Sequence, residues 1–226
     1  MGERDTWEIL HATRLLRPGD VIFDVGANFG HYSITLADVL KRHCEVHAFE
    51  PFPSNAERLR TNIRLNNLDA VVRIHPIALS DSAGSAYMNT RPDNSGAATL
   101  AQTSTEEVGR HLTAVTTLDS FCTQHQISKL DFVKIDVEGY EERLLLGGRQ
   151  TIGSFGPAIL IEFDPPKLQR AGSSVDRLAA LLRSFGYELW VPDRKRLVPL
   201  IAMPKGSDLI NVFCLREKHR RSLERK

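Results

Sequence analysis

The 226-residue chain has few cysteines, no long apolar run and no excess of charge of either sign. Its three cysteines, Cys44, Cys122 and Cys214, lack the close spacing of metal ligands, so we expect reduced thiols and a cytoplasmic location. No window approaches about 18 apolar residues, which leaves no candidate for a membrane-spanning helix. Charged residues at positions 3–5 stand where the apolar run of a signal peptide would build up, so none is predicted.

Acidic and basic side chains are almost balanced. The chain has 29 Lys and Arg residues against 28 Asp and Glu residues, a formal net charge of +1. No overall field therefore attracts nucleic acid or an anionic membrane, and we predict neither as a partner. The basic tail from Arg216 to Lys226 contains no Phe, Trp or Tyr on which a base would stack, so we interpret it as a solvated helix end. The sequence leaves the oligomeric state open.

Apolar runs of strand type alternate with helical patterns along most of the chain. Hydrophobic residues make up 42% of the sequence, enough for the core of one domain spanning residues 1–226. Helices are predicted between the strands, including one capped by Ser54, one capped by Thr117 and one over 139–147. This alternation favours an α/β fold with a parallel sheet. The predicted strands are 21–25, 46–50, 70–75, 130–136, 157–163, 187–191 and 209–215.

The segment at about 82–115 interrupts the alternation. It is rich in Ser, Gly, Ala and Thr and contains a turn signal at 92–96. We predict short strands and loops here, with a strand at 112–116. Two interpretations remain open, because long insertions in compact domains are often functional. The segment forms either a lid or wall beside a substrate or a hairpin that extends the edge of the sheet.

The stretch from Val21 to Gly30 predicts a buried strand, a tight turn and the start of a helix. Gly26 and Gly30 let the backbone bend sharply and approach a ligand closely. The helix that begins near His31 points its N-terminal N–H groups toward the same place. Glu50 ends the next strand, where an acid can accept hydrogen bonds from ribose hydroxyls. Together these signals predict a nucleoside cofactor.

Two kinds of nucleoside cofactor fit this layout. Dinucleotide-binding turns usually read G-x-G-x-x-G, but Asn28 and His31 occupy the second and third glycine positions here. S-adenosylmethionine has no phosphate; turn N–H groups can take its carboxylate, and Asp24 can take its ammonium. Asp24 would repel two phosphates, which favours S-adenosylmethionine, although Asp24 can also simply cap the turn. The cofactor residues predicted in this region are Asp24, Gly26, Ala27, Asn28 and Gly30.

Five segments in order carry a more specific signal. They are Asp24–Gly30, Phe49–Asn55, His75–Asp81, Thr116–Asp119 and Lys134–Glu141. With these the chain resembles the FkbM family of S-adenosylmethionine-dependent methyltransferases, from about residue 21 to 163. The resemblance implies a Rossmann-like class I methyltransferase fold, with a mostly parallel seven-stranded sheet, helices on both faces and an antiparallel last strand. It also implies methylation of a hydroxyl on a small molecule or sugar, without fixing which one.

The resemblance also implies where the adenine lies. The segment Ala78, Leu79 and Ser80, after the third predicted strand, is similar to the family segment that lines the adenine ring. Backbone groups and an apolar wall suit that ring. Asn55 is interpreted as a helix residue without a ligand role.

Methyl transfer to a hydroxyl needs alignment and usually a base, and acids follow two adjacent predicted strands. Asp136 is predicted nearest the methyl group, flanked by Glu138 and Glu162, and Lys134 can neutralise a buried acid. Several acids at adjacent strand ends repel one another, so at least one should have a raised pKa. Acids at strand ends also cap helices, which is the alternative for Glu138. Mg²⁺ is a third use of such carboxylates, but no ligand set is forced and no metal is predicted.

Three other functions remain as alternatives to a hydroxyl methyltransferase. An N-methyltransferase would use the same cofactor. A non-catalytic binding protein would keep only the fold, but Asp24, Gly26, Gly30, Glu50 and Asp136 are all present. A nicotinamide oxidoreductase is disfavoured by the residues in the glycine positions of the turn.

Overall fold

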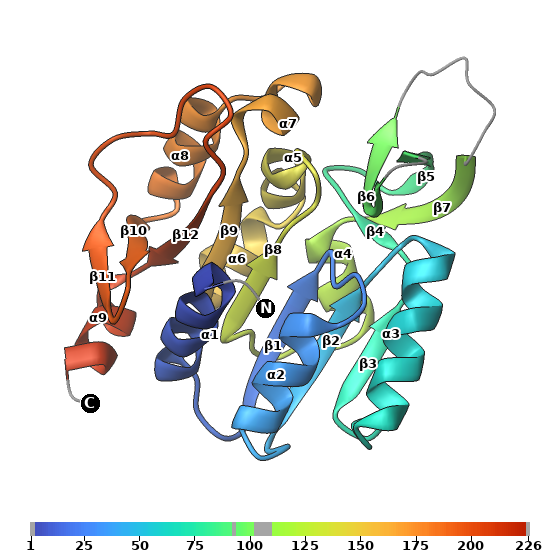
Figure 1. Cartoon of the computed structure of the whole chain (residues 1–226), viewed down its shortest axis with the longest axis horizontal. Helices are drawn as coiled ribbons and strands as arrows, with labels where there is room; N and C mark the ends of the chain where they lie inside the picture. The colour runs from blue at the N-terminus through green and yellow to red at the C-terminus, as the bar shows by residue number, and fades with distance from the viewer. Residues whose placement is uncertain (1–2, 92–93, 102–109, 225–226) are drawn as a thin grey trace.

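The computed structural model describes the backbone of residues 3–91, 94–101 and 110–224 (Figure 1). The elements form one large sheet with helices on both faces and one smaller sheet beside it (Figure 1). In the described part of the chain no helix has the length and apolar character needed to cross a membrane. The three cysteines are free thiols, as predicted.

The large sheet has eight strands in the order β11-β10-β12-β9-β8-β1-β2-β3. The five strands from β9 to β3 run parallel, and β12 is antiparallel to both of its neighbours, as the family resemblance implied. The predicted count of seven is short by one, because β11 folds back on β10 as an edge strand. The strands are β1 (Asp20–Val25), β2 (Cys44–Phe49), β3 (Val72–His75), β8 (Phe132–Ile135), β9 (Ala158–Phe163), β10 (Glu188–Asp193), β11 (Arg196–Pro199) and β12 (Ile210–Leu215).

Alternating side chains of the strands build an apolar core on each face of this sheet. In β1, Phe23 and Val25 join the cluster on one face, and Ile22 joins the cluster on the other. The first face is covered by α4 (Leu118–Gln124), α5 (Glu141–Leu146), α6 (Arg149–Phe155), α7 (Pro165–Arg170) and α8 (Val175–Ser184). The second is covered by α1 (Glu3–Leu15), α2 (His31–Val39) and α3 (Pro53–Leu65), with α9 (Glu217–Glu224) near the end of the chain (Figure 1).

The interrupted segment forms a separate four-stranded sheet in the order β4-β7-β5-β6. An extension of the large sheet is therefore the wrong interpretation for the described residues. The wall interpretation fits, since Met88 of β5 lines the cavity described below. Residues 92–93 of the predicted turn and residues 102–109 lie outside the described part. The strands are β4 (Ala78–Leu79), β5 (Gly84–Arg91), β6 (Asn94–Ala101) and β7 (Arg110–Thr116).

Two predicted helix starts differ in outcome. Thr117 caps α4 as predicted, since its side chain accepts a hydrogen bond from the Ser120 N–H at 3.0 Å. Ser54 does not cap α3. Phe52 is the N-cap, and Pro53 occupies the first turn of the helix, where a missing N–H costs nothing and the fixed φ suits the helix. The helix therefore begins at Pro53, one residue before the predicted cap.

Candidate active site

A cavity opens at the carboxyl ends of β1, β2 and β8, with a wall contributed by the smaller sheet. It encloses about 720 Å³ of space not filled by atoms, its open mouth included. The predicted site residues that line it are Gly26, Asn28, Glu50, Ala78, Leu79, Asp136 and Glu138. The predicted site residues outside its lining are Asp24, Ala27, Gly30, Ser80 and Glu162.

The turn after β1 uses its N–H groups within the protein. Those of Gly26 and Ala27 both donate to the Phe49 carbonyl at 3.0 Å. The N–H of Asn28 donates to Glu50 Oε2 at 2.8 Å. The N–H groups of the turn from Gly26 to Gly30 were predicted to take a ligand carboxylate. In the structure these three already have protein acceptors.

The two glycines of the turn are required by packing between parts of the protein. Gly26 has a φ of +82°, and a Cβ added there would lie 1.8 Å from the carbonyl oxygen of Asp136. Gly30 has a φ of +95°, its N–H donates to the Ala27 carbonyl at 2.8 Å, and an added Cβ would lie 2.5 Å from Leu59 Cδ1 of α3. The glycines were predicted to let a ligand approach the backbone closely. In the structure they let the turn pack closely against the end of β8 and against α3.

Asp24 caps the helix that follows the turn. Its Oδ2 accepts hydrogen bonds from the N–H of Ser33 at 3.0 Å and from the Ser33 hydroxyl at 2.6 Å, and the residue is 2% exposed. Burial raises the pKa of Asp24, while Ser33 and the charge of Lys134 oppose the shift. Of the two interpretations left open, the structure supports capping.

Glu50, directly after β2, presents a fixed carboxylate to the cavity. Its Oε2 accepts the Asn28 N–H at 2.8 Å and its Oε1 accepts the Phe52 N–H at 3.0 Å. The side chain of Asn55 adds a further hydrogen bond, and burial raises the pKa of Glu50 against the effect of these donors. A carboxylate has about four lone-pair positions, and with three of them used about one remains for a hydroxyl donor of a ligand.

Asn55 was interpreted from the sequence as a helix residue without a ligand role, but its position makes it a candidate ligand group. It lies in α3, is 2% exposed and lines the same cavity. Its Oδ1 is buried and has no hydrogen-bond partner among the described residues. Leaving a buried acceptor unpaired costs about 1–3 kcal/mol. The atom therefore marks a position for a ligand donor beside Glu50.

An apolar wall faces these polar groups. Ala78 and Leu79 of β4 line it as predicted, and Ile77, Met88 and Val137 complete it. No sequence signal pointed to Met88, since β5 meets this cavity only through the packing of the smaller sheet. An apolar slot of this kind suits a flat aromatic ring.

Ser80, the third predicted adenine-side residue, is placed differently. It is 7% exposed, its N–H donates to the Thr116 carbonyl at 2.9 Å, and its own carbonyl packs against Gly147. Ser80 therefore joins the end of β4 to β7 and does not line the cavity.

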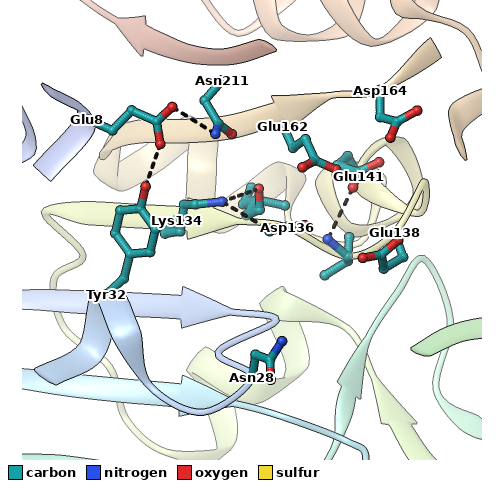
Figure 2. Close-up of polar contacts among 12 residues, drawn as sticks. Glu8, Asn28, Tyr32, Lys134, Asp136, Glu138, Glu141, Glu162, Asp164 and Asn211 are labelled. Carbon is teal, nitrogen blue, oxygen red and sulfur yellow. Dashed lines mark hydrogen bonds and ion pairs between the residues drawn. The ribbon is translucent and has the colours of Figure 1, made fainter. Parts of the chain in front are cut away.

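Asp136 ends β8 and lies between the cavity and a buried ammonium group (Figure 2). Its side chain is 38% exposed, whereas that of Lys134 is 3% exposed, and Lys134 Nζ donates to Asp136 Oδ2 at 3.4 Å. Burial alone would lower the pKa of Lys134, but Asp136, Glu162 and other nearby carboxylates raise it overall. Lys134 therefore keeps its charge and neutralises the acid, as predicted.

A second ammonium group, from α7, lies among three carboxylates. Lys167 Nζ is 2.8 Å from Glu162 Oε2, 3.0 Å from Glu138 Oε2 and 3.5 Å from Asp164 Oδ2. Burial raises the pKa of Glu162 to about 7; repulsion from Asp136 adds to the shift and Lys167 opposes it. The raised pKa agrees with the prediction for these acids, but burial is its first cause and repulsion between the acids its second.

The loop that carries Glu138 is held by Glu141. Glu141 Oε1 accepts the N–H of Val137 at 3.1 Å and that of Gly139 at 3.2 Å. Glu138 and Gly139 have φ values of +56° and +104°, so α5 begins at Glu141 and not at Gly139 as predicted. Capping of the helix by Glu138 is also wrong, since its carboxylate pairs with Lys167.

The charged residues that line the cavity have one sign. Its described lining contains three carboxylates, from Glu50, Asp136 and Glu138, and no Lys, Arg or His. Such a lining favours a cationic ligand over a pyrophosphate. No group of three or more His, Cys, Asp and Glu residues has the arrangement of a metal site in the described residues.

Comparisons with known proteins agree with this geometry. Residues 24–189 match the Methyltransferase FkbM domain. The chain is 32% identical over 160 residues to the 31-O-demethyl-FK506 methyltransferase FkbM of Streptomyces tacrolimicus, covering 58% of this chain and 60% of that one. It is 30% identical over 146 residues to the hexuronic acid methyltransferase AglP of Haloferax volcanii, covering 65% of this chain and 56% of that one.

A solved structure shows the same fold. The crystal structure of Methyltransferase FkbM from Methylobacillus flagellatus KT superposes with a TM-score of 0.58 at 18% identity, covering 88% of this chain and 44% of that chain. This chain thus spans between two fifths and three fifths of the length of these three proteins. The domain match covers most of its residues, and the chain belongs to the FkbM family of methyltransferases.

Proposed function

We propose that this protein is an S-adenosylmethionine-dependent O-methyltransferase that acts on a hydroxyl of a small molecule or sugar. The observation that carries the proposal is the cavity at the carboxyl ends of β1, β2 and β8, whose charged lining is entirely acidic. The names of two relatives support it: one is named for an O-demethylated substrate and the other for a hexuronic acid.

The lining fits the cofactor at three places. The wall of Ile77, Leu79 and Met88 suits an adenine ring. Glu50 and the unpaired Oδ1 of Asn55 suit the two hydroxyls of a ribose. The carboxylates beyond them suit a positive charge and offer nothing to a phosphate. A nicotinamide dinucleotide fits less well for that reason.

S-adenosylmethionine supplies a methyl group on a positively charged sulfur, which makes that methyl electrophilic. Asp136 is placed to accept the proton that leaves the acceptor hydroxyl, since it is the partly exposed acid of the cavity wall. Lys134 holds it from behind at 3.4 Å and limits its freedom to turn away.

Glu138 and Glu162 contribute negative charge near Asp136 at the same end of the cavity. Lys167 ties both carboxylates to α7 and keeps them from repelling Asp136 at full strength. Burial, first among the causes, raises the pKa of Glu162 to about 7, so the charge that it adds beside Asp136 changes near neutral pH. We further propose a cytoplasmic location, which suits the three free thiols.

Two measurements test the proposal. Titration calorimetry should show binding of S-adenosylhomocysteine, with NAD⁺ at least about tenfold weaker. Incubation with S-adenosylmethionine labelled with ¹³C at its methyl group, over a panel of hydroxylated acceptors, should give a product whose methyl carbon has the NMR shift of a methyl ether. Tighter binding of NAD⁺ would reject the cofactor. A methyl carbon with an N-methyl shift would reject the acceptor atom and keep the cofactor.

A further inference from the structure

A second cavity lies on the other side of β8, over the end of the sheet where β12 begins. It is formed by α1, β10, β12 and the segment 200–209, and it encloses about 1360 Å³ of space not filled by atoms, its open mouth included. Glu8, Ser207, Asp208 and Asn211 give it polar groups, while Pro192 and Met203 give it apolar surface. None of its lining residues takes part in the reaction proposed above.

Its position relates it to the proposed reaction. In the sheet order, β1 and β2 lie on one side of β8, and β9 and β12 lie on the other. Asn211 of β12 is the partner of Glu162 in the strand register, at the carboxyl end of β9. Figure 2 shows Glu8 and Asn211 on one side of Asp136 and Asn28 on the opposite side. Asp136 and Glu138 line the first cavity, and Glu162 lies in the strand next to Asn211 of the second.

A buried hydrogen-bond network fixes the polar groups of the second cavity. Glu8 is 1% exposed; its Oε2 accepts the Tyr32 hydroxyl at 2.6 Å and its Oε1 accepts the Asn211 Nδ2 at 3.0 Å. Because a carboxylate only accepts, this bond also fixes which way the Asn211 amide is turned. Asn211 Oδ1 is then left buried with no hydrogen-bond partner among the described residues. The atom needs a donor, and a hydroxyl group supplies one.

The charge of the lining restricts the kind of molecule that binds. Among the described residues of its wall, Glu8 and Asp208 are acidic and there is no Lys, Arg or His. An acidic ligand would meet these carboxylates, and the cation whose charge Glu8 affects, Lys134, is buried and already paired with Asp136, so its binding is unfavourable. A neutral molecule with several hydroxyls can donate to Asn211 and place its C–H surface against Pro192 and Met203.

We propose that this second cavity is the acceptor site and that it takes a neutral sugar residue. The inference rests on the proposed methyltransferase function and adds to it the place and the class of the acceptor. A sugar bound there reaches the acids at the ends of β8 and β9 from the side of β12, opposite the cavity that fits S-adenosylmethionine. The site therefore differs in acceptor charge from that of the relative named for a hexuronic acid.

Saturation-transfer NMR on the full chain with saturating S-adenosylhomocysteine tests the inference. The probes are the methyl glycosides of glucose, galactose, mannose and rhamnose, with sodium glucuronate as the acidic counterpart. At least one neutral glycoside should bind the parent protein, and glucuronate should bind at least about tenfold more weakly. Stronger binding of glucuronate, or binding of none of the glycosides, would overturn the assignment of a neutral sugar.

Three variants locate the binding. Ala202→Trp fills the cavity from an exposed position and leaves the Glu8–Asn211 bond intact, so the fold is kept and glycoside binding should fall at least about tenfold. Asn211→Ala removes the unpaired acceptor and should weaken binding about fivefold. Ala70→Trp, exposed before β3 at the opposite end of the sheet, is the matched control and should bind like the parent.

Binding of S-adenosylhomocysteine distinguishes a failure of the proposed acceptor site from a failure of the proposed methyltransferase function. All three variants should bind S-adenosylhomocysteine with the affinity of the parent. If they do and Ala202→Trp still binds glycosides normally, the acceptor site lies elsewhere while the methyltransferase proposal stands. If the parent itself does not bind S-adenosylhomocysteine, the proposed function fails, and the inference fails with it.

Discussion

The turn after β1 and the segment after β2 meet at the same end of the sheet, but their polar groups are used differently. The N–H groups of Gly26, Ala27 and Asn28 bond to acceptors on the second segment. Glu50 and Asn55 of that segment keep bonding capacity directed to the cavity. The glycine-bearing turn, which is the more conspicuous in the sequence, thus forms a packed backbone support for the cavity, which we call the platform. The segment after β2 presents the groups that fit a ribose. A glycine signal can mean close packing of backbone as well as close approach of a ligand.

The largest effect is expected at the platform. Gly26→Ala places a Cβ 1.8 Å from the Asp136 carbonyl oxygen at a position whose φ is +82°, so strand end and turn must move apart. We expect the free energy of unfolding to fall by at least about 3 kcal/mol, measured by denaturant titration. Loss of binding should then follow loss of structure.

A matched glycine provides the control for that change. Gly153 lies within α6, and a Cβ added there meets nothing within 4 Å. Gly153→Ala should raise the free energy of unfolding by up to about 1 kcal/mol through helix propensity. If Gly26→Ala were as stable as Gly153→Ala, the turn would not be a packing platform and its glycine would have to be explained by a ligand.

Asp136 has both a packing role and a role in the cavity, because its backbone packs against Gly26 and its side chain lines the cavity. Asp136→Asn changes only the second role. We expect turnover to fall by about 10²-fold or more, with S-adenosylhomocysteine affinity within about tenfold of the parent. Steady-state kinetics and calorimetry measure the two quantities. Parental turnover would make the carboxylate structural and transfer the role of base to Glu138 or Glu162.

The next pair of variants compares the two segments directly. Glu50→Ala removes a carboxylate that fits the ribose and should weaken S-adenosylhomocysteine binding by about 1.5–3 kcal/mol. Asn28→Gly keeps the N–H that bonds to Glu50 and the left-handed φ of +52°, so affinity should stay within about threefold. Calorimetry reads both. If both variants lost the same amount of S-adenosylhomocysteine affinity, the turn would contribute to ligand binding as much as Glu50 does.

The smallest effect concerns pH and the loop after β8. Burial, first among the causes, raises the pKa of Glu141 to about 7 in the folded protein, above that of an exposed Glu. The folded state therefore binds more protons than the unfolded state between about pH 4.5 and 7, and stability falls as pH rises through that window. The slope from one group reaches at most about 1.4 kcal/mol per pH unit.

Glu141→Gln should reduce this slope while keeping an oxygen for the Val137 or Gly139 N–H. Denaturant titrations at pH 5, 6 and 7 measure it, with Glu57→Gln on the exposed face of α3 as the control. Glu162, whose pKa is also raised to about 7 by burial, leaves a residual slope in both variants. An unchanged slope in Glu141→Gln would show that Glu141 titrates like an exposed acid.

The sequence predicted most of the large sheet because its buried strands are short apolar runs flanked by turn residues. β11 was not predicted, since Arg196–Pro199 is polar in part and becomes a strand only by pairing with β10. The start of α5 was misplaced because the positive φ of Glu138 and Gly139 depends on how α7 packs there. Local sequence propensity cannot predict these contacts, because they join segments that are distant along the chain.

The candidate site was predictable where a residue follows a strand. Glu50, Asp136 and Glu138 lie at such positions and line the cavity as expected. Met88 and Asn55 were missed, because the first depends on the packing of a second sheet and the second on an amide that completes the surroundings of Glu50. Asp24 was assigned to a ligand because its bonds to Ser33 appear only when α2 is in place.

The segment 200–209 has a consequence for how such enzymes diversify. It is an irregular connection between β11 and β12, and most of its residues are partly or fully exposed to solvent. β8 and β9 separate it from Glu50 and Asn55 in the order of the sheet. Substitutions there leave the ribose-side groups unchanged, so the two halves of the reaction can evolve independently. If the second cavity is the acceptor site, as proposed, a library restricted to residues 202–208 is an economical starting point for changing the acceptor.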